Sequence, residues 1–151
     1  MTAIIRDVDV TTLIPHRGPM HLIDRINWVD TDVIRGEVRA CLRADGPYFT
    51  QSVNGEVSEF ENHWLIELAA QSSAALYQYS RQGAHKASPK GYLVSIRDFS
   101  TSEGLELKAR DELLFRIIFE VETSPLGQSR CEVRLGSTLI AHGELTFLLD
   151  V

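Results

Sequence analysis

The residues that could do chemistry in this chain are its histidines and a few carboxylates, and their spacing points away from metal chemistry. The five histidines stand at positions 16, 21, 63, 85 and 142 and form no local ligand cluster. The HExxH, CxxC, GxSxG, GxGxxG and P-loop patterns are also missing from the sequence, which argues against the commonest zinc, serine-hydrolase, dinucleotide and phosphoryl-transfer enzymes. Any chemistry must therefore come from a sparse acid–base site, and we expect neither a metal nor a cofactor.

Three segments together resemble one enzyme family. The stretch Leu13–Ile26 reads LIPHRGPMHLIDRI, and residues 67–71 read ELAAQ. A third stretch, Tyr92–Phe99, is followed by RDEL at residues 110–113. In this order the segments resemble the 3-hydroxyacyl-acyl-carrier-protein dehydratases of the hot-dog fold, whose opening reads PHR-x-P and whose central helix carries Glu-x-x-Ala-Gln. The resemblance covers roughly residues 13 to 148 and implies an α+β protein with one long central helix wrapped by a curved antiparallel sheet.

The sequence departs from that family at one important point. The related fatty-acid enzymes carry a catalytic histidine in a His-Phe-Pro-Gly loop about fourteen residues before the helix glutamate, whereas this chain has QSVNG there, around Val53. The Pro-Gly that opens the family's helix is replaced by Glu61 and Asn62. The chain therefore resembles a divergent branch, similar to the dehydratase-like proteins of aryl-polyene and related polyketide pathways.

The chemistry implied by the resemblance assigns roles to particular residues. Removing water from a 3-hydroxyacyl thioester needs a base for the proton beside the carbonyl and an acid for the departing hydroxide. We expect His16 to be the base and Glu67 to be the acid, held protonated in an apolar groove. We expect His63 and Gln71 to bind substrate, and His63 is also a candidate replacement for the missing histidine.

Each of these residues also has a purely structural interpretation. Glu67 could form a buried ion pair with Arg17, Arg25 or Arg97, and His16 could be a turn residue that bonds to the main chain. His63 stands four positions before Glu67, so the two could simply be neighbours on one helix face.

The elements that must position these residues follow from hydrophobic periodicity. Strict alternation from Val33 to Leu42 predicts a half-buried strand, and His21–Val29 predicts a strand that pairs with it through the turn at residues 30–32. A helix of about 20 residues is predicted from Ser58, spaced as a capping box with Glu61, to a C-terminal Gly83. Four further strands are predicted at Tyr92–Phe99, Leu113–Val121, Cys131–Leu135 and Thr138–Leu148.

Composition sets the outer limits of function. The 151 residues are 44% apolar and 24% charged, with a net charge of −6, which predicts one domain over residues 1–151 and disfavours a nucleic-acid partner. No apolar run approaches the length of a membrane span, and the acidic start MTAIIRDVDV does not resemble a signal peptide, so we expect a cytoplasmic protein. The cysteines Cys41 and Cys131 lie in alternating apolar patterns and are expected to be reduced core residues.

The expected function is dehydration of 3-hydroxyacyl thioesters, carried on acyl carrier protein or coenzyme A, to trans-2-enoyl thioesters. The missing loop keeps open a non-catalytic partner subunit of a homologous dehydratase, and a hot-dog thioester hydrolase that uses Glu67 remains a third alternative. The family implies a homodimer or a heterodimer with a related subunit. Two basic groups are candidates for docking the acidic carrier: Arg35, Arg39 and Arg43 on one strand, and Arg81, Lys86 and Lys90 beyond the helix.

Overall fold

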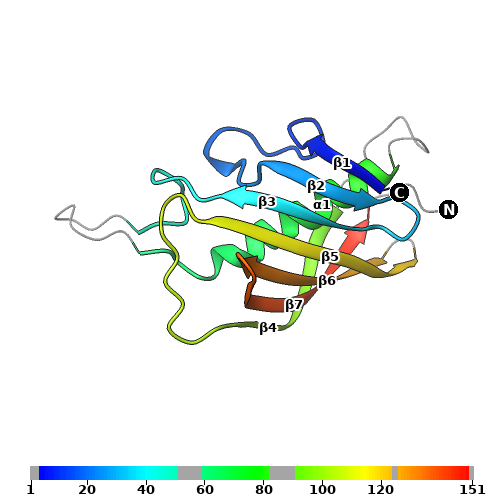
Figure 1. Cartoon of the computed structure of the whole chain (residues 1–151). Coiled ribbons are helices and arrows are strands. Elements are labelled where there is room, and N and C mark those ends of the chain that lie inside the picture. Colours follow the sequence, from blue (N-terminus) through cyan, green and yellow to red (C-terminus); the bar gives the residue numbers. More distant parts are fainter. Residues whose placement is uncertain (1–3, 51–58, 82–90, 124–125, 150–151) are drawn as a thin grey trace.

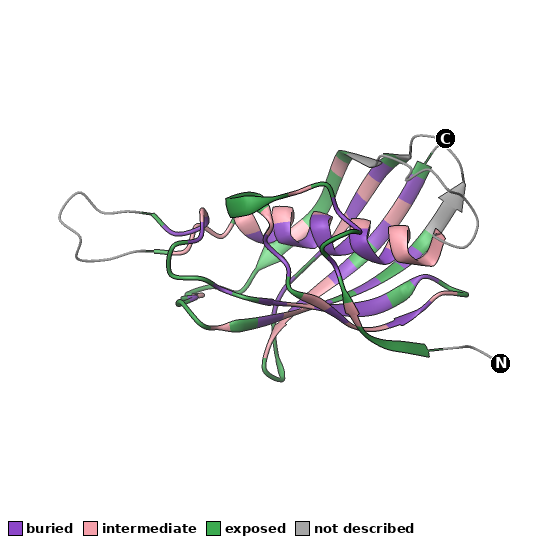
Figure 2. Ribbon diagram, turned by 90° about the horizontal axis from the view of Figure 1, so that it is seen from above, coloured by how far each residue is buried: buried purple, intermediate pink, exposed green. Residues whose placement is uncertain are grey.

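Alternating apolar residues build one curved antiparallel sheet that wraps a helix. The computed structural model describes residues 4–50, 59–81, 91–123 and 126–149. Within these residues, seven strands form a single sheet in the order β1-β2-β3-β5-β6-β7-β4, and α1 lies against its concave face (Figures 1 and 2). The elements are β1 (Ile4–Asp9), the 3-10 helix η1 (Gly18–Met20), β2 (Arg25–Asp30), β3 (Arg35–Cys41), α1 (Trp64–Arg81), β4 (Gly91–Thr101), β5 (Glu112–Thr123), β6 (Leu126–Leu135) and β7 (Thr138–Leu149). This is the predicted architecture of one helix and a curved antiparallel sheet.

The strand predictions after the helix are confirmed. In β5, the alternate residues Leu113, Phe115, Ile117 and Phe119 are all buried, as the period of two requires. β6 and β7 pair as a hairpin across residues 136 and 137. Gly136 has a φ of +62°, which a glycine adopts without strain.

The strands before the helix are confirmed with shifted ends. β2 and β3 pair antiparallel, but β2 begins at Arg25 rather than His21 because η1 and the loop that follows occupy the intervening residues. The His21 N–H donates to the Gly18 carbonyl (3.1 Å) and closes this short turn. β1, for which the periodicity analysis named no residues, pairs with β2 and extends the sheet by one edge strand.

The predicted start of the helix was wrong. α1 begins at Trp64, whereas Ser58 and Gly83, the predicted ends, lie outside the described residues. Residues 59–61 instead run alongside residues 48–50: the Thr50 N–H donates to Glu59 and the Glu61 N–H to Tyr48, both at 2.8 Å. Three aromatic rings, Tyr48, Phe49 and Phe60, pack together there with centroids 5.2–5.8 Å apart. This packing holds residues 59–61 in an extended conformation, so the helix begins only at Trp64.

The apolar face of α1 fills the concave side of the sheet. Leu65, Leu68, Ala75 and Leu76 are fully buried there, and Figure 2 shows α1 lying across the strands. Gly36 in β3 allows α1 to approach closely, because a Cβ at that position would lie 2.9 Å from the Leu76 side chain. No helix among the described residues is both long enough and apolar enough to span a membrane.

The two cysteines differ in environment. Both are free thiols, and Cys131 is buried as predicted. The expectation of a core position was wrong for Cys41, which is exposed at the end of β3. The reason is the pleat of the strand, because Cys41 belongs to the alternate set of residues that point away from α1.

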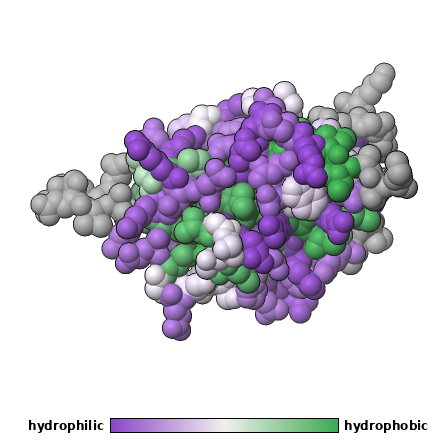
Figure 3. All heavy atoms as spheres, viewed as in Figure 1, coloured by the Kyte–Doolittle hydropathy of each residue, from purple (hydrophilic) through white to green (hydrophobic). Residues whose placement is uncertain are grey.

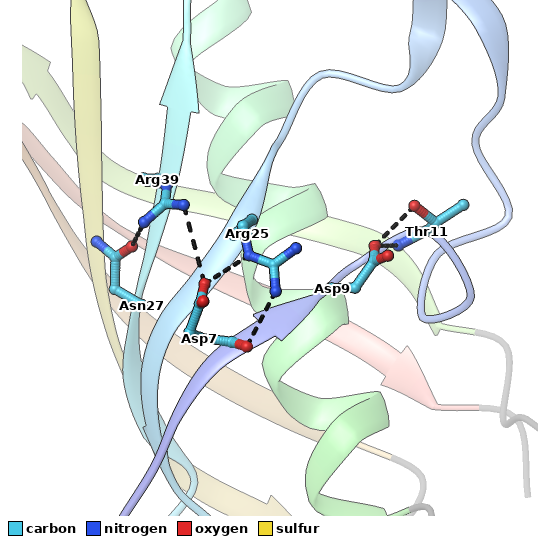
Figure 4. A network of polar contacts seen from close by, with 6 residues as sticks. All are labelled: Asp7, Asp9, Thr11, Arg25, Asn27 and Arg39. Carbon is cyan, nitrogen blue, oxygen red and sulfur yellow. Dashed lines mark hydrogen bonds and ion pairs between the residues drawn. The ribbon is translucent and has the colours of Figure 1, made fainter.

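The convex face of the sheet is polar. Figure 3 shows mostly hydrophilic residues on this side of the molecule, with smaller hydrophobic areas between them. At the β1 edge, the Asp7 carboxylate pairs with Arg25 and Arg39, and Arg39 also donates to Asn27 (Figure 4). Nearby, Asp9 accepts two hydrogen bonds from Thr11, which lower the pKa of its carboxyl. These contacts connect β1 to β2 and β3.

Candidate functional site

A histidine and a glutamate from distant parts of the chain meet beside the start of α1. His16 lies in the loop between β1 and β2, and Glu67 lies in the first turn of α1. The His16 Nε2 is 3.6 Å from the Glu67 Oε1, and the two side chains are 32% and 36% exposed. The pair is therefore accessible to a substrate and close enough to interact. The sequence predicts Glu67 in an apolar groove, and in the structure its side chain is about one-third exposed.

Gln71 connects this pair to the loop. Its Nε2 donates to the Met20 carbonyl (2.8 Å) and to the Glu67 Oε1 (3.2 Å). Its Oε1 accepts the Leu22 N–H at 3.0 Å. The side chain is 1% exposed, and both of its N–H groups are used by these bonds. The sequence predicts that Gln71 binds substrate, and that role stays a prediction; in the structure its side chain connects the loop to Glu67.

The ring of His16 is held with one nitrogen toward the glutamate. Its Nδ1 is buried and has no hydrogen-bond partner among the residues that the structure describes, so Nε2 is the nitrogen that can exchange a proton with Glu67 or with a bound molecule. Glu67 offers its second oxygen, because Oε2 has no hydrogen-bond partner among the described residues. An imidazole and a carboxyl group with one open oxygen can act as a general base and a general acid.

None of the three arginines considered as ion-pair partners of Glu67 pairs with it in the described structure. Arg25 pairs with Asp7, and Arg17 donates to the main-chain carbonyls of Ile14 and His16. Arg97 is exposed in β4 and, within the described part of the chain, makes no ion pair. Glu67 is therefore not held in a salt bridge by an arginine of the described chain.

Among the described residues, His63 contacts Glu61 and Trp64 rather than His16 or Glu67. It precedes α1, its side chain is 66% exposed, and its Nε2 lies 3.7 Å from the Glu61 carboxylate. Its ring also lies beside that of Trp64, with centroids 5.9 Å apart. The structure thus brings His16, Glu67 and Gln71 together and leaves His63 outside the group. The QSVNG stretch around Val53, the position of the family's catalytic loop, lies outside the described residues.

The basic groups predicted to dock a carrier are only partly available. Arg39 is engaged by Asp7 and Asn27, and Arg35 lies 3.8 Å from the Asp30 carboxylate. Arg43 donates to the Pro19 carbonyl at 3.2 Å. The Arg43 N–H also donates to the Tyr48 hydroxyl, and burial raises the pKa of that phenol. In the second group, the Arg81 guanidinium stacks over Tyr77 (5.6 Å), and Lys86 and Lys90 lie outside the described residues.

One residue missed by the sequence reasoning takes part in the site's construction. Arg17 was considered only as an ionic partner of Glu67, yet its guanidinium contacts the main chain on both sides of Pro15. Its position next to His16 in PHRGPM was the available signal. Every residue has a backbone carbonyl, so the sequence does not indicate which carbonyls an arginine contacts. Only the folded loop shows these two contacts.

Comparison with known proteins places the chain among relatives of the same fold. A family model described as "ApeP-like: ApeP dehydratase" matches residues 8–149. The dehydratase heterocomplex ApeI:P from Xenorhabdus doucetiae contains a chain with a TM-score of 0.81 and 19% identity; the match covers 97% of this chain and 93% of that one. A putative thioesterase from Ralstonia eutropha JMP134 matches with a TM-score of 0.60 and 15% identity, over 82% of each chain.

A hypothetical thioesterase from Streptococcus pneumoniae, solved with coenzyme A, gives a TM-score of 0.55 and 9% identity; the match covers 77% of this chain and 78% of that one. The comparison with curated protein sequences gives no match. The similarity to the solved structures confirms the predicted hot-dog fold.

Proposed function

The chain belongs to the ApeP-like dehydratase family, and from this membership and the geometry of its site we propose that it dehydrates 3-hydroxyacyl thioesters to trans-2-enoyl thioesters. The observation that carries the proposal is the 3.6 Å approach of the His16 Nε2 to the Glu67 Oε1. Elimination of water requires an acid and a base, and the proximity of these two partly exposed side chains supports assigning those roles to them.

The proposed reaction transfers one proton from the substrate carbon to His16 and another from Glu67 to the departing hydroxyl group. His16 Nε2 takes the proton from the carbon beside the thioester carbonyl, and the electron pair of that C–H bond forms the new carbon–carbon double bond. The C–O bond to the hydroxyl then breaks, and protonated Glu67 delivers its proton to the departing oxygen, which leaves as water. Transfer of the proton from His16 to Glu67 across their short separation restores both groups.

The contacts of Glu67 support its proposed role as the acid. Gln71 and His16 both approach Oε1, which leaves Oε2 to face the substrate hydroxyl. Gln71 is itself fixed by Met20 and Leu22, so the carboxyl is held from the protein side. A general acid needs this kind of fixed geometry, because proton transfer depends on hydrogen-bond distance.

The structure also offers a place for a second subunit. β4 is the last strand of the sheet (Figure 1) and carries the exposed apolar residues Leu93, Val94 and Ile96. An unpaired, apolar strand edge favours pairing with another strand. We propose that a second hot-dog chain, identical or related, pairs with this edge. The Xenorhabdus doucetiae relative is part of a dehydratase heterocomplex, which supports a related chain as the partner.

Two alternatives to dehydration by this chain are tested beside it: thioester hydrolysis and a non-catalytic role as a partner subunit. Glu67 could activate water for hydrolysis of the thioester, which the thioesterase relatives of this fold make worth measuring. The absence of the His-Phe-Pro-Gly loop motivates a non-catalytic subunit. The proposed substrate is linked either to acyl carrier protein or to coenzyme A, and the coenzyme A in the Streptococcus pneumoniae structure supports including the second carrier.

Mass spectrometry of the thioester separates these functions. A 3-hydroxyacyl thioester on carrier protein and on coenzyme A is incubated with the chain alone, and with a dehydratase subunit that carries the His-Phe-Pro-Gly loop. Loss of one water with the thioester intact supports the proposal. Release of free acid would replace it with hydrolysis. If product forms only with the second subunit, and equally well with Glu67→Gln in this chain, the chain is a non-catalytic partner.

A further inference from the structure

The main chain around His16 is held by a side chain rather than by secondary structure. Main-chain hydrogen bonds enclose this stretch: the Leu13 N–H donates to Val10, and the Met20 N–H donates to Arg17. Between them, the peptide groups of Ile14, Pro15 and His16 make no hydrogen bond to another main-chain group of the described residues. Pro15 has no N–H to donate, and the carbonyl groups of Ile14 and His16 are left to accept hydrogen bonds from side chains.

Arg17 supplies these contacts. Its NH1 nitrogen donates to the Ile14 carbonyl at 2.7 Å and to the His16 carbonyl at 2.8 Å. Both distances are short for N–H···O bonds, as expected for a charged donor. The side chain makes no ion pair with a carboxylate of the described chain, so the guanidinium is committed to the loop that precedes it.

The rest of the loop is fixed by other groups, but none of them contacts the main chain of His16. Gln71 binds the main chain of Met20 and Leu22, and Arg43 donates to the Pro19 carbonyl. These anchors act three or more residues after the histidine. The direction of the His16 side chain depends on the peptide that carries it, and that peptide is bonded only to Arg17 among the described residues.

We propose that Arg17 is a positioning residue of the site, which holds the His16 main chain so that Nε2 faces Glu67. The inference rests on the proposed function for its effect on turnover, but the effect on the His16 ring is independent of it. Without the guanidinium, the two carbonyls turn toward solvent and the imidazole loses its fixed approach to the carboxyl. Because a misplacement of about 1 Å can cost on the order of 100-fold in rate, the loss falls mainly on kcat.

The first test observes the ring itself. Nitrogen NMR of the His16 imidazole is recorded in the chain with and without Glu67→Gln, and again on an Arg17→Ala background. We expect the Nε2 signal to respond to Glu67→Gln with Arg17 present and to lose most of that response in Arg17→Ala. An equal response on both backgrounds would overturn the inference, whether or not the protein turns over substrate.

The second test measures turnover by the chain together with any subunit that it needs for activity. The control is Arg43, another arginine that contacts the same loop. Arg17→Ala is expected to lower kcat by roughly 10–100-fold with little change in KM, and added guanidinium ion is expected to restore part of it. Arg17→Lys retains a cationic donor, and its kcat is expected to lie between that of the native chain and that of Arg17→Ala. Arg43→Ala, which removes the contact to Pro19, is expected to have a smaller effect. An Arg17→Ala enzyme with unchanged kcat, or an equal loss in Arg43→Ala, contradicts the assignment.

Discussion

The two histidines nearest the helix start differ most clearly in their contacts. His16 is half-buried and faces Glu67, whereas His63 is exposed and faces Glu61. We therefore expect His16→Ala to lower the dehydration rate by about 10²–10⁴-fold, the usual contribution of a general base. His63→Ala is expected to lower it by less than about tenfold. Steady-state rates of the two purified variants decide the point, and the reverse ranking would transfer the role of base to His63.

A buried thiol gives the protein a predictable dependence on alkaline pH. Burial raises the pKa of Cys131 above its ordinary value of about 9. The folded state therefore keeps a proton that the unfolded state releases, so this contribution to stability is complete below about pH 9 and is lost as the pH rises further. We expect the free energy of unfolding to decline above about pH 9, with up to about 1.4 kcal/mol per pH unit from this group.

Denaturant unfolding between about pH 7 and pH 11 measures this decline. Cys131→Ala should make it shallower, whereas Cys41→Ala, which removes an exposed thiol, should leave the slope unchanged. Equal slopes in the native chain and in Cys131→Ala would show that other groups control the alkaline response.

Between elements, α1 approaches β3 closely at Gly36. A methyl group at Gly36 would overlap the Trp28 carbonyl oxygen and press on Leu76, and the main-chain oxygen cannot move without disturbing the pairing of β2 and β3. Gly36→Ala is therefore expected to destabilise the protein by about 1–3 kcal/mol, as for other overpacked cores. Thermal or chemical denaturation measures the change, and an unchanged midpoint would mean that α1 can shift away.

The elements show which features a sequence can predict. The strands β5, β6 and β7 follow from alternation, because each has one face of buried apolar residues and one face that is more exposed and richer in polar residues. The helix start does not follow from its local capping pattern, because the aromatic packing of Tyr48 and Phe49 with Phe60 is a contact between two separate segments. The site likewise depends on contacts between separate segments. The family resemblance predicts His16 and Glu67 as site residues, but their contact depends on the loop that Arg17 and Gln71 hold in place.

For the molecule as a whole, the proposed association with a second chain concerns the β4 edge. The register of β4 against β7 shifts twice, between Leu93 and Ser95 and between Arg97 and Ser100, and Asp98 in the second shift has a φ of +51°. The exposed apolar residues Leu93, Val94 and Ile96 all lie before the second shift, so we expect a partner strand to pair with the first half of β4. Val94→Lys is expected to weaken association at least about tenfold, because it places a charge on the edge where the partner would bind.

Sedimentation velocity of the chain, alone and mixed with a related dehydratase subunit, measures this association. Leu139→Lys provides a control, because Leu139 is an exposed apolar residue of β7, which is flanked by β6 and β4. Association that is insensitive to Val94→Lys, or equally sensitive to both variants, would place the interface elsewhere.

The central claim is that Glu67 donates the proton that turns the substrate hydroxyl into water. The most direct measurement is the rate at which Glu67→Gln converts a 3-hydroxyacyl thioester to the enoyl thioester, followed by mass spectrometry in the active assembly beside the native chain. The amide fills nearly the same volume but cannot act as a carboxylic acid, so we expect an intact fold and a rate lower by about 10²–10⁴-fold. A correctly folded Glu67→Gln protein that retains more than about a tenth of the native rate would contradict this mechanism.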